Sequence, residues 1–106
     1  MNFSNVKDII SKIRDNQANY QKVVICGLSQ ANNFTLSRDE VATLLKAKNP
    51  DSNHEISYFK SLSCPVYKIL GNKGIITVTS DTVKANFKLS ASQRNEIKKL
   101  CMEVRS

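Results

Sequence analysis

The sequence has little of what catalytic and metal-binding sites are usually built from. Its 106 residues include one histidine and three widely separated cysteines, and this spacing does not match a zinc site. Three glycines are too few for a glycine-rich loop around a phosphate. The nine acidic residues are scattered along the chain, so no catalytic constellation emerges. We therefore expect no enzyme activity, no metal and no cofactor.

Long apolar runs are missing as well. A membrane-spanning helix needs roughly 18 consecutive apolar residues, whereas the apolar runs of this chain end within a few residues. The first ten residues, MNFSNVKDII, lack the basic start and the apolar core of a signal peptide. These absences predict a cytoplasmic protein that does not enter a membrane.

The three cysteines are expected to be reduced. Cys26, Cys64 and Cys101 are odd in number and lie far apart in the sequence, which is typical of thiols in a cytosolic protein. Cys64 precedes an expected helix start, a position that can lower the pKa of a thiol. No histidine stands near it in the sequence to complete a catalytic pair.

What the chain does contain is typical of one soluble domain. Its length is close to the commonest domain size, and its 41% apolar and 24% charged residues are ordinary for a globular protein. We predict a single, mostly helical α+β domain over residues 1–106. Its core covers about residues 19–90, and its flanking helices cover residues 3–16 and 92–104.

Apolar residues at spacings of three and four predict the helices. Such a stripe runs through the first flanking helix, and residues 19–30 are nearly apolar throughout, as in a core helix. Ser37 and Glu40 form a capping box at the start of a third helix, and Ser52 and Glu55 form another at the start of a fourth.

The apolar stripe of the fourth helix continues past Pro65. A proline inside a straight helix costs roughly 3 kcal/mol, because it removes one backbone hydrogen bond and clashes with the preceding turn. We therefore expect either a kink near residues 62–64 or a break in which Ser63 caps a restarted helix. Gly74 suits the left-handed residue that ends this segment.

After Gly74 the apolar period changes from that of a helix to that of a strand. IITVT, residues 75–79, is a short β-rich run, and VKANFKL, residues 83–89, alternates strictly between apolar and polar side chains. The SDT between them supplies turn residues, so the two runs are predicted to form a hairpin. Ser90 or Ser92 then caps the final helix.

The predicted order is helix, extended segment, helix, turn, helix, hairpin and helix. This order resembles the winged-helix family, a helix-turn-helix variant followed by a β-hairpin wing, over about residues 19–90. Pro65 inside the second helix of the pair, and Gly71 in place of a charged helix former, depart from the family pattern. The segments that carry the resemblance are TLSRDEVATLL (35–45), HEISYFKSLSCPVYKIL (54–70), NKGIITV (72–78) and VKANFKL.

In that family the second helix of the pair usually enters the major groove, and the wing contacts the adjacent DNA backbone or minor groove. The charge distribution agrees, because the net charge is +7 and residues 56–94 contain six basic residues against one acidic residue. The resemblance therefore implies double-stranded DNA as the partner. Five or six phosphate contacts would give a slope of log affinity against log salt of roughly −4 to −5. The implied DNA contacts are Arg38, Asn53, Tyr58, Lys60, Ser61, Lys68, Lys84, Asn86 and Lys88.

Other interpretations of the same residues stay open. Lys84 and Lys88 also fit the solvated side of a hairpin, and Tyr67 fits either the edge of the core or the DNA face. The flanking helices either cover the core or pair across a two-fold axis in a homodimer. A transcriptional regulator is the favoured function. The alternatives are a protein-assembly module and the DNA-recognition subunit of a larger nucleic-acid-processing complex.

Overall fold

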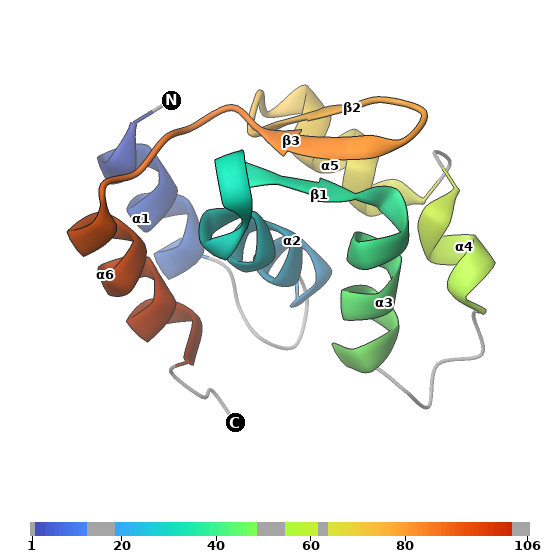
Figure 1. Ribbon diagram of the computed structural model, residues 1–106, viewed down its shortest axis with the longest axis horizontal. Helices are drawn as coiled ribbons and strands as arrows, with labels where there is room; N and C mark the ends of the chain where they lie inside the picture. The colour runs from blue at the N-terminus through green and yellow to red at the C-terminus, as the bar shows by residue number, and fades with distance from the viewer. Residues whose placement is uncertain (1, 13–18, 49–54, 62–63, 103–106) are drawn as a thin grey trace.

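The computed structural model describes residues 2–12, 19–48, 55–61 and 64–102 (Figure 1). The chain is α+β and mostly helical, as predicted, with a three-stranded antiparallel sheet. Within the described ranges, no helix combines the length and the apolar character that crossing a membrane requires. The elements are α1 (Phe3–Lys12), α2 (Asn19–Gln30), the 3₁₀ turn η1 (Asn32–Phe34), β1 (Thr35–Ser37), α3 (Arg38–Lys48), α4 (Ile56–Lys60), α5 (Pro65–Asn72), β2 (Ile76–Val78), β3 (Thr82–Ala85) and α6 (Ala91–Met102).

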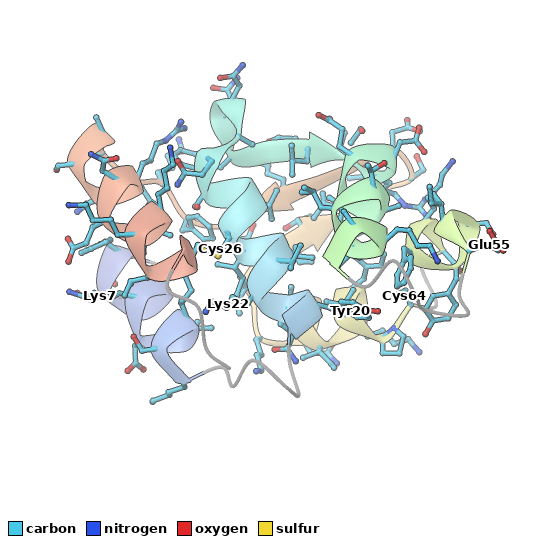
Figure 2. The ribbon with its side chains drawn as sticks, turned by 90° about the horizontal axis from the view of Figure 1, so that it is seen from below. Lys7, Tyr20, Lys22, Cys26, Glu55 and Cys64 are labelled. Carbon is cyan, nitrogen blue, oxygen red and sulfur yellow. A yellow bond between two sulfur atoms is a disulfide. The ribbon has the colours of Figure 1, made fainter. Side chains whose placement is uncertain are left out.

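Helix α2 lies at the centre of the molecule, with α1 and α6 to one side of it and α3 to the other (Figure 1). Its residues Val24, Ile25 and Leu28 are at most 1% exposed. This burial agrees with the run of apolar residues over 23–28. Lys7 of α1 and Glu55, just before α4, lie at opposite edges of the molecule (Figure 2).

The sheet has the order β1-β3-β2, so β3 is its central strand. Val83 of β3 faces Leu36 of β1 and Val78 of β2. The predicted alternation along residues 83–89 is confirmed and continues beyond the end of β3. Its apolar members are buried and its polar members are exposed: Val83, Ala85, Phe87 and Leu89 against Lys84, Asn86 and Lys88.

Reciprocal capping pairs mark the starts of α3 and α6. The Glu40 backbone N–H donates to the Ser37 hydroxyl at 3.0 Å, and the Ser37 N–H donates to the Glu40 carboxylate at 2.9 Å, as predicted. Ser90 and Gln93 make the same reciprocal pair at the start of α6, at 3.2 and 2.9 Å, so Ser90 is the cap. The predicted box at Ser52 lies outside the described residues.

The helix expected around Pro65 is broken rather than kinked. Helix α4 ends at Lys60, and α5 begins with Pro65 in its first turn, where the missing N–H removes no helical hydrogen bond. Cys64 occupies the N-cap position, so the expectation that Ser63 caps the restarted helix is wrong. Gly74 follows α5 with φ of 75°, which confirms its predicted left-handed conformation.

The flanking helices cover the core within one chain. Helix α1 packs against α6, and α6 packs against α2. Val6, Ile10 and Ile97, which belong to the apolar stripes of these helices, are at most 3% exposed. A homodimer through α1 and α6 stays a prediction, and it would have to use their outer, polar faces.

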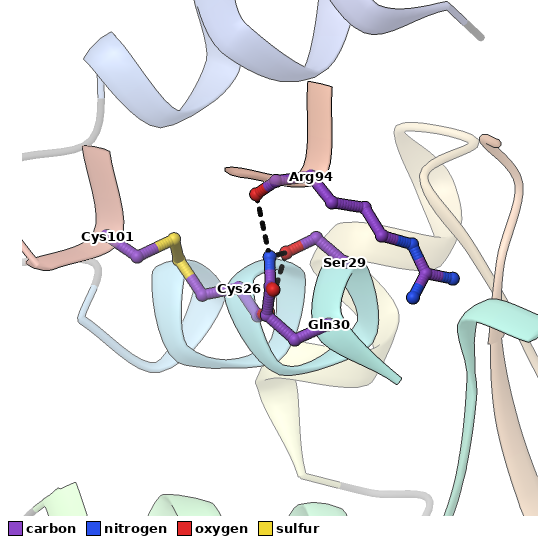
Figure 3. Close-up of a disulfide and its surroundings, with 5 residues drawn as sticks. All are labelled: Cys26, Ser29, Gln30, Arg94 and Cys101. Carbon is purple, nitrogen blue, oxygen red and sulfur yellow. Dashed lines mark hydrogen bonds between the residues drawn. A yellow bond between two sulfur atoms is a disulfide. The ribbon is translucent and has the colours of Figure 1, made fainter. Parts of the chain in front are cut away.

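Cys26 of α2 and Cys101 of α6 form a disulfide, with Cα atoms 6.1 Å apart (Figure 3). The expectation that all three cysteines are reduced is therefore wrong, and only Cys64 is a free thiol. Near the disulfide, the Gln30 side-chain amide donates to the Arg94 carbonyl at 3.0 Å. Both links connect α2 to α6, whose packing brings together two cysteines that are 75 residues apart.

Candidate nucleic-acid interface

Arg38, predicted to contact a phosphate, donates two hydrogen bonds to the hairpin turn. One guanidinium nitrogen, Nη1, donates to the Ser80 carbonyl at 2.7 Å, and the Arg38 backbone N–H donates to the Asp81 carbonyl at 2.9 Å. Its Nε atom is buried without a hydrogen-bond partner. The side chain is half-buried and lies between the start of α3 and the turn after β2. A phosphate contact by Arg38 stays a prediction, and it would compete with the hydrogen bond to the turn.

Lys60, at the end of α4, forms an ion pair with Asp39 of α3, with 2.6 Å between Nζ and the carboxylate oxygen. The Lys60 side chain is 47% exposed and that of Asp39 is 74% exposed. Solvent screens such a pair, so it adds little to stability. It does offset the positive charge that Lys60 was expected to offer to DNA.

Tyr58 and Ser61 are half-buried at the α4 end of the molecule. The Tyr58 ring packs edge-on against the Phe59 ring, with centroids 5.3 Å apart. Ser61 is the C-cap of α4, and its backbone N–H donates to carbonyls of that helix. Both residues are therefore part of the packing of α4. Asn53 lies outside the described residues.

Tyr67 belongs to the core, which settles the alternative left open by its sequence position. It is 3% exposed, and its hydroxyl donates to the Phe59 carbonyl at 2.5 Å. Burial, with a smaller contribution from nearby Cys64, raises the pKa of Tyr67 to about 12, against the opposing effect of the Arg38 charge. Tyr67 is not available to a DNA ligand.

Cys64 also differs from its expected chemistry. Burial raises the pKa of its thiol, and this outweighs the hydrogen bond from the Val66 backbone, which lowers it. The expectation of a lowered pKa at the helix start is wrong. A buried thiol with a raised pKa is a poor nucleophile at neutral pH. Among the described residues, no group of three histidine, cysteine, aspartate or glutamate side chains is placed to hold a metal ion.

Three of the predicted contacts keep an available charge: Lys68 on α5, Lys84 on β3, and Lys88 after it. All three are exposed, and none forms an ion pair or hydrogen bond within the described part of the chain. Asn86 lies between the last two, but its side chain is committed to the hairpin. It accepts from the Thr77 hydroxyl at 2.9 Å and donates to the Gly74 carbonyl at 3.1 Å.

Lys84 and Lys88 line one groove of about 630 Å³, which also involves the first residues of α1 and of α6. The lysines therefore lie toward the base of the hairpin and not at its tip. Sequence reasoning missed the groove residues Asn2, Phe3 and Gln93. No local pattern indicates that residues near the two flanking helix starts meet the outgoing strand.

No family model, curated protein or solved structure matches this chain.

Proposed function

We propose that this protein binds double-stranded DNA without catalysis, as a winged-helix transcriptional regulator of the cytoplasm. The observation that supports this most directly is the order of the elements. Helix α2, strand β1, helix α3, the broken helix α4–α5, the β2–β3 hairpin and α6 follow the order on which the winged-helix resemblance rests. In this proposal α5 is the counterpart of the helix that approaches the major groove.

The charges available for phosphate contacts are fewer than the sequence suggested. Lys68, Lys84 and Lys88 have no internal partner in the described part of the chain, whereas Arg38 and Lys60 do. Each phosphate neutralised on B-form DNA adds about −0.9 to the slope of log affinity against log salt. Three contacts give a slope of about −2.7, in place of the −4 to −5 expected from the larger set.

Fluorescence anisotropy of a mixed-sequence duplex, titrated at several salt concentrations, tests the proposal. The variant Lys84→Ala, Lys88→Ala should flatten the slope to about −0.9. The matched control is Lys98→Ala, Lys99→Ala, because it removes the same charge from exposed residues of α6 that do not line the groove. Absence of binding at low salt, or equal losses in both variants, would contradict the proposal.

One observation favours a second candidate, a protein-assembly module. Among the described residues, the exposed large hydrophobic side chains lie on α3, α4 and α5: Leu44, Ile56 and Ile69, at 38%, 44% and 38% exposure. Exposed apolar side chains favour contact with another protein surface. Sedimentation velocity at rising protein concentration, with Ile56→Ser, Ile69→Ser as the comparison, measures whether these side chains mediate assembly. A dimer that the variant abolishes, together with no DNA binding, would favour assembly.

A further inference from the structure

The groove beside β3 is formed by three segments that are far apart in the sequence. The chain that leaves β3 passes the first turn of α1 before it enters α6 (Figure 1). The groove is lined by residues 84–88, by Asn2 and Phe3 at the start of α1, and by Gln93 of α6. A volume of about 630 Å³ lies within the range of small-molecule sites, roughly 300–1,000 Å³.

The side-chain amides of the groove have their oxygens occupied. Asn2 Oδ1 accepts the backbone N–H three residues later at 3.0 Å, and Gln93 Oε1 accepts the backbone N–H three residues earlier at 2.9 Å. Asn86 Oδ1 accepts the Thr77 hydroxyl. The NH₂ groups of Asn2 and Gln93 thus remain as donors, and that of Asn86 keeps one hydrogen beyond its bond to Gly74. The amides therefore offer the groove free N–H donors, whereas each of their oxygens already accepts one hydrogen bond.

The charged groups of the groove are also donors only. Lys84 and Lys88 supply two ammonium groups, and no acidic side chain is among the described residues that line it. On extended chain, residues four apart are separated by about 13 Å. Two flexible lysines at that spacing can approach an extended anion from both ends. The groove therefore favours a ligand rich in acceptor oxygens and disfavours a cation.

The remaining lining is apolar and aromatic. Phe3 of α1 is half-buried and supplies the accessible aromatic surface, whereas Ala85 and Phe87, at 4% and 2% exposure, belong to the buried face of the strand behind the groove. A purely ionic ligand would make no use of the accessible part of Phe3. An aromatic ring on the ligand could pack against the Phe3 ring.

We propose that this groove binds a small organic polyphosphate that carries an aromatic ring. The lysine ammonium groups and the amide NH₂ groups bind the phosphate oxygens, and the ring packs against Phe3. The site does not depend on the proposed DNA binding. It is tested without DNA, so a protein that fails to bind DNA can still bind this ligand.

The test uses three probes in isothermal titration calorimetry: ADP, adenosine without phosphates, and pyrophosphate without a ring. ADP should bind more tightly than either of the other two. In two-dimensional NMR, the amide signals shifted by ADP should include those of residues 2, 3, 84–88 and 93. Equal affinity for ADP and adenosine, or for ADP and pyrophosphate, would overturn the proposal. Shifts confined to other parts of the chain would do the same.

Gln93→Glu is the decisive variant, because it keeps the capping box with Ser90 while it replaces the NH₂ donor by a negatively charged oxygen. ADP binding should weaken by about tenfold or more, as expected when a hydrogen bond to a charged group is lost. Asn95→Asp makes the same chemical change at an exposed residue of α6 outside the groove, and should leave affinity within about twofold. Equal weakening by both variants would show only general electrostatics and would overturn the site.

Discussion

Basic residues at the two ends of the β2–β3 hairpin differ in whether the fold supplies them with partners. At the turn, Arg38 donates to the Ser80 carbonyl, and nearby Lys60 pairs with Asp39. At the base, Lys84 and Lys88 face a groove whose amide oxygens are already occupied. We call the first the tip surface and the second the base groove. A count of basic residues would treat them alike, but only the base groove offers its charge to a ligand.

The difference arises from which acceptors the fold supplies. A hairpin turn presents backbone carbonyls, and Asp39 lies in the first turn of α3, where a carboxylate is favoured by the helix dipole. Both attract cations to the tip surface. Capping interactions at the starts of α1 and α6 use amide oxygens and leave amide hydrogens in the base groove. Local backbone requirements thus set the polarity of both surfaces.

Removal of the disulfide should have the largest effect on stability, and it should loosen first the side of the base groove, whose Gln93 lies on α6. The link joins residues 75 apart, and the entropy of closing such a loop corresponds to about 4 kcal/mol of stability. Cys26→Ser, Cys101→Ser should lower the free energy of unfolding in urea by about that amount. Hydrogen exchange should accelerate in α6 before it does in α3.

The control for this prediction is the unmodified protein with and without dithiothreitol. Reduction should reproduce the loss in the unmodified protein and should leave the double variant unchanged. Alkylation of the unfolded protein, followed by mass spectrometry, should detect one reactive thiol without a reducing agent. The same experiment after reduction should detect three. Three reactive thiols before reduction would mean that the disulfide does not form.

Alkaline pH should lower the free energy of unfolding through Tyr67, which is buried beside Arg38 on the side of the tip surface. The folded protein holds the Tyr67 pKa at about 12, whereas an unfolded tyrosine ionises near pH 10. The folded state keeps its proton to higher pH. Stability is therefore complete below about pH 10, and it falls by about 2 kcal/mol as pH rises to 12.

Urea unfolding at pH 8 to 11.5, compared between the unmodified protein and Tyr67→Phe, isolates this effect from other titrations. The difference in the free energy of unfolding between the two proteins should shrink as pH rises, because only the unmodified protein carries the ionising hydroxyl. A difference that stays constant over this range would contradict the raised pKa of Tyr67.

Arg38→Met should reduce stability more than it reduces DNA binding. The substitution removes the hydrogen bond to the Ser80 carbonyl, which is worth about 2 kcal/mol for a charged donor. It also removes the buried, unpaired Nε, and this offsets part of the loss. Lys68→Met is the control, because Lys68 is exposed and its stability effect should stay within about 0.5 kcal/mol. The salt slope of DNA binding should flatten for Lys68→Met and not for Arg38→Met. The reverse result would return Arg38 to the interface.

Much of the fold could be predicted because its signals are local. The capping box at Ser37 and Glu40, the left-handed Gly74 and the alternation over residues 83–89 each depend on residues a few positions apart. The disulfide could not be predicted, because only the packing of α6 on α2 brings its two cysteines together. Pro65 showed that the helix is interrupted, but choosing between a kink and a break required the packing of α4 and α5.

Less of the candidate site could be predicted. The alternating strand pattern correctly exposes Lys84 and Lys88, since exposure follows from register. It does not reveal that Asn86, on the same face, is held by Thr77 and Gly74. The partners of Arg38 and Lys60 come from distant segments, so sequence alone treated these side chains as available. Tertiary contacts decide which charges remain.

The smallest predicted effect comes from a substitution that gives the tip surface an available positive charge, as the base groove has. Asp39→Asn removes the partner of Lys60 without a change in size, so the Lys60 charge becomes available. Because this exposed pair is screened by water, the free energy of unfolding should change by less than about 0.5 kcal/mol. The slope of log affinity for DNA against log salt should steepen by about 0.9 if Lys60 then reaches a phosphate. Asp8→Asn is the control, since it releases Lys12 on α1, away from the tip surface, and leaves the slope unchanged. An unchanged slope in Asp39→Asn would show that the tip surface lies outside the DNA contact altogether.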